Sequence, residues 1–135
     1  MKLVKISLAA WIACAGLAGC SNAKEYAIEG EVKASAAVSG KIALEFFQLD
    51  TVDGKTSRQS VHKATLEKLG AFKEKVDLTP GTKALVVAIA DSNNDGVCSE
   101  GELWGEATLD KLEEGKTNLI TVNLAAAPCP AAGSK

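Results

Sequence analysis

The stretch that decides the fold spans residues 84–105 and reads ALVVAIADSNNDGVCSEGELWG. It begins with a short apolar run, residues 84–90, in which three residues are β-branched, and this predicts a strand buried on both faces. At Asp91 the run stops, and a polar loop follows with carboxylate and amide side chains at alternate positions. A second short apolar segment comes after the loop. The sequence therefore predicts a buried β-strand that leads into a cation-binding loop.

The loop carries oxygen ligands at the spacing of a calcium site. Counted from Asp91 as the first position, Asn93, Asp95, Val97 and Glu102 take the third, fifth, seventh and twelfth. This spacing resembles the calcium loop of EF-hand proteins, in which the seventh residue offers its backbone carbonyl and the last a bidentate carboxylate. The resemblance covers the loop alone, because the flanking segments predict strands and not helices. It implies that these five residues bind Ca²⁺.

The same loop also has a metal-free interpretation. Asn, Asp and Gly form tight turns without any metal, because their side chains bond the local backbone or tolerate left-handed conformations. Residues 91–106, however, contain five acids and no base, and a bound cation relieves such repulsion. If Ca²⁺ binds, we expect an affinity on the order of 10⁻⁴–10⁻³ M, because only two of the first three ligands are charged.

The N-terminus predicts a signal peptide over residues 1–19. Lys2 and Lys5 precede a short apolar segment, which ends in Leu17-Ala18-Gly19-Cys20. This motif resembles the bacterial lipobox, which implies cleavage before Cys20 and lipidation of its thiol by chains such as palmitate. With Ser21 next, the resemblance implies sorting to the outer membrane, facing the periplasm or the cell surface. Residues 20–25 then form a short tether, and the acyl chains attach the protein to the membrane.

The charge of the processed chain excludes some partners. Two of the 15 basic residues leave with the signal, so 13 basic residues remain against 17 acidic ones, a net charge of −4. Such a balance argues against nucleic acid as a partner. The expected partners are the membrane, through the N-terminal lipid, and an envelope protein or glycan.

Cysteine usage indicates an exported protein. Cys14 leaves with the signal and Cys20 is lipidated, so Cys98 and Cys129 remain and predict a disulfide. This bond would tie the tail, residues 125–135, to the middle of the polar loop. Two free thiols, or a redox pair, are the alternatives.

Residues 26–124 predict one all-β domain. Segments of alternating or continuous apolar residues, separated by turn signals, indicate about seven short strands in an antiparallel Greek-key β-sandwich. Residues 57–69 fit a short helix or a strand, and we favour the strand. Two motifs, Gly70-Ala71-Phe72 and Leu78-Thr79-Pro80-Gly81, resemble a hairpin of transthyretin-like, carboxypeptidase-regulatory-type sandwiches. The resemblance implies an immunoglobulin- or transthyretin-like sandwich that serves as a binding or structural module.

No catalytic residues are predicted. The single histidine, His62, fits a surface or edge position, and no nucleophile motif or zinc-binding histidine pair occurs. We therefore expect a non-enzymatic envelope module with a Ca²⁺-stabilised loop. Two alternatives are a glycan-binding module, in which Trp104 and the acidic loop contact sugar, and an accessory or inhibitor domain for an exported partner. Trp104 either contacts a partner or caps the end of the sandwich against the disulfide.

Overall fold

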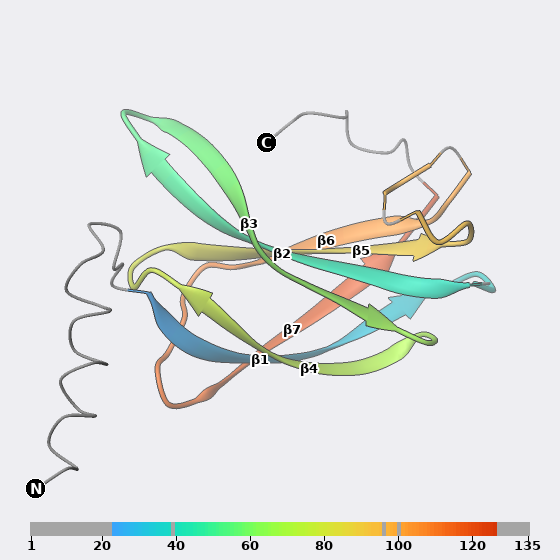
Figure 1. Ribbon diagram of the computed structural model, residues 1–135, viewed down its shortest axis with the longest axis horizontal. Coiled ribbons are helices and arrows are strands. Elements are labelled where there is room, and N and C mark those ends of the chain that lie inside the picture. Colours follow the sequence, from blue (N-terminus) through green and yellow to red (C-terminus); the bar gives the residue numbers. More distant parts are fainter. Residues whose placement is uncertain (1–22, 39, 96, 100, 127–135) are drawn as a thin grey trace, which may run out of the picture.

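Seven β-strands and no helix make up the described part of the chain in the computed structural model (Figure 1). The structure describes residues 23–38, 40–95, 97–99 and 101–126. In chain order the strands are β1 (Lys24–Ala34), β2 (Lys41–Val52), β3 (Lys55–Leu66), β4 (Gly70–Leu78), β5 (Lys83–Asp91), β6 (Trp104–Leu109) and β7 (Thr117–Leu124). The predicted all-β, seven-stranded fold is confirmed.

The strands form two sheets that pack face to face. One sheet has the order β4-β1-β7 and the other the order β3-β2-β5-β6. Figure 1 shows β1, β4 and β7 in one layer and β2, β3, β5 and β6 in the other. Four of the five strand pairs are antiparallel, as expected, but β1 and β7 run parallel. The first and last strands of the domain are thus direct neighbours.

Several of the predictions made from the sequence fall outside the described residues. These are the signal peptide of residues 1–19, the lipidation site Cys20, and Cys129 with the tail after residue 126. Within the described ranges, no helix is long and apolar enough to cross a membrane. The anchor and the disulfide therefore stay predictions.

The core lies between the sheets and follows the alternation of the strands. Ile42, Leu44 and Phe46 of β2 point inward, and β7 alternates strictly between buried and exposed residues. Strand β5 is buried at every position after Lys83, which confirms the prediction that both of its faces are covered. The buried inner set is Tyr26, Ile28, Val32, Ile42, Leu44, Phe46, Phe72, Val76, Leu78, Ala84, Val86, Ala88, Ala90, Ile120, Val122 and Leu124.

One glycine of β1 is required by the close approach of its neighbours. A Cβ atom on Gly30 would collide with the carbonyl oxygen of Ile120 in β7 and lie 2.8 Å from the ring of Phe72 in β4. The register explains this crowding, because Gly30 is paired with both residues at the centre of the three-stranded sheet. Any larger side chain at this position must therefore displace backbone.

Residues 57–69, which fitted either a helix or a strand, belong mainly to β3. This strand pairs with β2, and a two-residue turn at Asp53 and Gly54, both with positive φ, connects them. Strand β3 is an edge strand, as a surface position for His62 requires.

The edges of the two sheets are linked through His62. Its Nε2 lies 2.7 Å from Oε1 of Glu74 on β4, and its ring packs 5.5 Å from the ring of Phe46. Both polar side chains are about one-third exposed or less. The single histidine of the chain therefore joins β3 of one sheet to β4 of the other.

Candidate calcium site

The acidic loop connects β5 to β6 at one end of the sandwich. Strand β5 ends at Asp91, and β6 begins at Trp104 and pairs back against β5. The backbone N–H of Ala90 donates to the carbonyl of Leu103 at 2.8 Å, which closes the loop at its base. Asp91 and Glu102 stand at the two ends of the loop and are 5% and 7% exposed. Two buried carboxylates thus stand at the base of the loop, Asp91 as the last residue of β5 and Glu102 two residues before β6.

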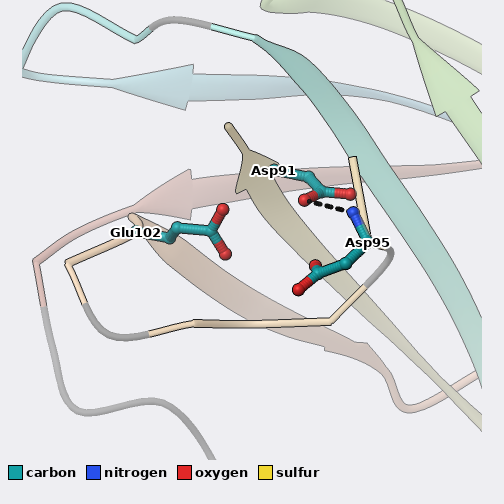
Figure 2. A group of neighbouring side chains, drawn as sticks. All are labelled: Asp91, Asp95 and Glu102. Carbon is teal, nitrogen blue, oxygen red and sulfur yellow. Dashed lines mark hydrogen bonds between the residues drawn. The ribbon is translucent and has the colours of Figure 1, made fainter. Parts of the chain in front are cut away.

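Three carboxylates face a common space in the loop. Asp91, Asp95 and Glu102 each present an oxygen, and these oxygens all lie within 4.8 Å of one another. Figure 2 shows Glu102 approaching from one side of the loop, and Asp91 and Asp95 from the other. Residues from the two ends and the middle of the loop therefore converge, although they span twelve positions of sequence.

Glu102 is fixed by hydrogen bonds from the loop itself. Its Oε2 accepts the backbone N–H of Ser92 at 2.7 Å and the Ser92 hydroxyl at 3.0 Å, and its Oε1 accepts the backbone N–H of Ser99 at 2.7 Å. Hydrogen bonds to a charged acceptor are the stronger class. The carboxylate consequently ties the start of the loop to its end. The sequence patterns did not predict a role for Ser92. The one available indication is that a serine just after a strand often donates hydrogen bonds to nearby acceptors.

The first half of the loop is curled by side chains that accept backbone N–H groups. The backbone N–H of Asp95 donates to Oδ1 of Asp91 at 3.1 Å and to Oδ1 of Asn93 at 3.3 Å, and the first of these bonds is drawn in Figure 2. Asn94 adopts a positive φ of 59°, a conformation that asparagine tolerates better than most residues. This curl turns alternate side chains toward the centre of the loop.

Asp95 is held in its charged form. The backbone N–H of Val97, donating to Oδ1 at 3.0 Å, is the main cause that lowers the pKa of Asp95 below its ordinary value of 3.8. The hydroxyl of Ser99 donates to Oδ2 at 3.2 Å and acts in the same direction. Asp95 is therefore ionised throughout the neutral range, as a cation ligand must be.

The donor set fits a hard divalent cation. The clustered groups are all carboxylates, and Ca²⁺ prefers oxygen ligands over nitrogen or sulfur. Of the five predicted ligands, Asp91, Asp95 and Glu102 come together. The Oδ1 of Asn93 accepts the backbone N–H of Asp95, whereas the side chain of Val97 is 58% exposed and its backbone N–H donates to Asp95.

Trp104 and Cys98 lie beside the loop on the outer face of the four-stranded sheet. Both are partly buried, and both pack against the apolar cluster that Leu85, Val87 and Ile89 of β5 form. Trp104 also exchanges two backbone hydrogen bonds with Ala125, at 3.2 and 2.9 Å, just after β7. This packing agrees with the capping role for Trp104. The disulfide stays a prediction, because Cys129 lies outside the described residues.

Comparisons with known proteins add no family to this description. No family model matches the chain, and neither a curated protein nor a solved structure gives a significant match.

Proposed function

We propose that this protein is a lipid-anchored, non-enzymatic module of the bacterial outer membrane, in which Ca²⁺ orders one end of a β-sandwich for contact with an envelope partner. The convergence of Asp91, Asp95 and Glu102 within 4.8 Å is the observation that carries the proposal. Two of these carboxylates are less than a tenth exposed, so water screens their repulsion poorly. A cation bound there would neutralise that charge and make the curled loop more rigid.

Different residues hold the two ends of the loop in place. Glu102 holds both ends of the loop through Ser92 and Ser99, and Asp91 terminates a strand buried on both faces. Asp91 and Glu102 are therefore placed before the cation binds, and the middle of the loop, around Asp95, is the part that the cation would order. Bound Ca²⁺ would supply charge neutralisation and no chemistry.

The packing of Trp104 supports a structural module over a sugar-binding platform. A sugar-stacking ring must offer an open aromatic face beside polar groups. Trp104 instead packs on the apolar outer face of β5 and is tied through its backbone to Ala125. The partner is accordingly expected to be an envelope protein that contacts the ordered loop.

Isothermal titration calorimetry of the full-length protein, first stripped with EDTA, tests the calcium site. We expect one Ca²⁺ per chain with a dissociation constant on the order of 10⁻⁴–10⁻³ M, and no heat for Asp91→Asn. Glu106→Gln is the matched control, because this acid belongs to the same segment but is exposed on β6. Absence of binding by the wild-type chain at millimolar Ca²⁺, with the loop folded, would remove the metal from the proposal.

The anchor has a separate test. Cells that express the chain are labelled with radioactive palmitate, and the outer membrane is isolated. We expect label on the wild-type protein in that fraction and none on Cys20→Ala. A wild-type chain that takes up no label, or a Cys20→Ala chain that remains in the membrane fraction, contradicts the anchor without affecting the calcium site.

A further inference from the structure

Strand β7 is an edge strand that lacks the features by which edge strands usually avoid pairing with other chains. Such strands are normally protected by charged side chains, proline, bulges or short length, because their unpaired N–H and C=O groups can bond to another strand. Of the other edge strands, β3 and β4 each contain several charged residues, and β6 is 6 residues long. Strand β7 reads TNLITVNL, without charge, proline or glycine. It is therefore the edge on which pairing is least opposed.

Close approaches on both sides of β7 show which of its residues turn their backbone groups to the free edge. The carbonyl oxygen of Ile120 faces Gly30 of β1, where a Cβ atom would collide with it. The carbonyl oxygen of Asn123 faces Gly105 of β6 in the same way, and Ala125 exchanges its backbone hydrogen bonds with β6. Both backbone groups of a strand residue point to the same side, and successive residues alternate. The odd-numbered residues of β7 thus face away from β1.

Three of these residues, Thr117, Leu119 and Thr121, have no strand beside them on the free side. The bridge to β6 lies at Ala125, beyond the end of β7, and the only ladder of β7 within the described residues is the one with β1. No hydrogen bond from the described part of the chain reaches their outward N–H and C=O groups. The side chain of Leu119 is 73% exposed, more than that of any other large hydrophobic residue in the described ranges. Unpaired backbone groups thus lie beside an exposed apolar side chain.

The pattern of this edge is complementary to itself. When a second copy is placed antiparallel, with a twofold axis at Leu119, the two Leu119 residues lie opposite each other and Thr117 lies opposite Thr121 of the second copy. All three positions then become hydrogen-bonded pairs that exchange two bonds each, because outward groups meet outward groups. On the solvent face a Leu–Leu pair stands between two Thr–Thr pairs, and no like charges lie opposite each other. A second copy therefore matches the edge in backbone, shape and charge.

We infer that two copies of this chain associate through β7, so that their three-stranded sheets become one continuous sheet with the order β4-β1-β7-β7-β1-β4. The contact is short, because β6 already occupies the edge at Asn123. Small interfaces belong to the weak class, so the dimer depends on the concentration of the chain. The inference goes beyond the proposed function, and it needs neither the lipid anchor nor a bound cation.

Amide hydrogen exchange, read residue by residue by NMR, tests the pairing on the full-length protein in detergent and EDTA. Chain concentrations run from about 10 μM to about 1 mM, which covers the range of weak association. The amides of Leu119 and Thr121 are expected to exchange severalfold more slowly at the high concentration, because their N–H groups become bonded only in the dimer. The amide of Ile120 is the internal control, because its backbone faces β1 in either state. Its exchange should not depend on concentration.

Two variants show whether the pairing runs through this edge. Leu119→Lys brings two like charges together at the twofold axis and should abolish the concentration dependence, whereas the exposed side chain contributes little to the monomer. Ala71→Lys is the matched control, because it adds the same charge to the exposed face of the same sheet, on β4, and should behave like the wild type.

Native mass spectrometry counts the chains in each sample and completes the test. Wild-type exchange that is the same at every concentration overturns the inference, and so does concentration-dependent protection that survives in Leu119→Lys. Protection of the edge amides in a chain that stays monomeric also overturns it, because another segment of the same chain must then cover β7. Dimers whose protection is spread equally over odd and even residues of β7 indicate a different contact and refute the pairing.

Discussion

Replacing Glu102 by glutamine tests directly whether the loop is built around a cation. The substitution keeps the size of the side chain and removes one of two buried charges. Without Ca²⁺ two effects oppose each other. An amide cannot accept on both sides, so at least one of the bonds from Ser92 or Ser99 is lost, which costs about 1.5–3 kcal/mol for a bond to a charged group.

The opposing effect is relief of repulsion. Oxygens of Asp91 and Glu102 lie within 4.8 Å of each other. Two unit charges at that distance repel by about 1 kcal/mol in bulk water and about 3.5 kcal/mol at the effective dielectric constant of a protein surface. The gain is of the same size as the loss, so we expect Glu102→Gln to change the stability of the calcium-free protein by no more than about 2 kcal/mol in either direction.

With Ca²⁺ present, the stabilities of the wild type and of Glu102→Gln should differ. At about 5 mM Ca²⁺ and a dissociation constant of 10⁻⁴–10⁻³ M, binding to the native state adds about 1–2.3 kcal/mol to the wild type. For a domain of this size that corresponds to a rise in melting temperature of roughly 4–18 °C. Glu102→Gln loses its bidentate ligand and should show little of this rise.

Differential scanning calorimetry measures the melting temperatures of the wild type and of Glu102→Gln, each in EDTA and in Ca²⁺. Glu106→Gln serves as the exposed-acid control. The control should behave like the wild type in both buffers. Two results would refute the reasoning: a Ca²⁺-induced rise in Glu102→Gln equal to that of the wild type, or a loss of several kcal/mol by the variant in EDTA alone. The second result would mean that Glu102 stabilises the loop purely by hydrogen bonding.

Three further predictions concern the sandwich and the loop. Gly30→Ala should cost at least about 3 kcal/mol or prevent folding, because its Cβ meets the carbonyl of Ile120, and urea unfolding measures the loss; a stable variant would show that β7 can move away. A double-mutant cycle on His62→Ala and Glu74→Gln should give a coupling of about 0.5–1.5 kcal/mol, and zero coupling would mean that the link between the sheets contributes nothing. Asp95, whose pKa is lowered in the fold, stabilises the native state above its ordinary value of 3.8 and loses that contribution as pH falls through the folded pKa. Acid unfolding of Asp95→Asn should therefore show a shallower pH dependence below 3.8, and identical curves would contradict the hydrogen bonding of the loop.

The strands could be predicted from sequence because their periodicity is strong. Alternation in β7 and the continuous apolar run of β5 mark which faces are buried. Even β3, which also fitted a helix, becomes a strand because β2 offers it a long antiparallel partner. Pairing is a different matter. Nothing local in β1 or β7 specifies that they run parallel, since that follows from how the two sheets close on each other.

The ligand residues of the candidate site could be predicted from the sequence, but the hydrogen bonds that hold them in place could not. The spacing of Asp91, Asp95 and Glu102 predicted that these residues come together, because alternate residues of a curled loop face its centre. The role of Ser92 depends on a side chain ten residues away in sequence, and no short-range pattern encodes that contact. Likewise, the apolar run of β5 predicts burial on both faces but does not name what covers the outer one.

The parallel pairing of β1 with β7 governs the order in which the fold can be completed. A polypeptide emerges from the N-terminus onward, so β1 exists long before residues 117–124 are made. Until then one edge of β1 has no neighbour, and it offers a template for pairing with another chain. Closing a ring of some ninety residues between the two strands is also slow, since such distant contacts cost chain entropy before they bring any gain. A nascent chain that ends before residue 117 consequently cannot complete the three-stranded sheet at all.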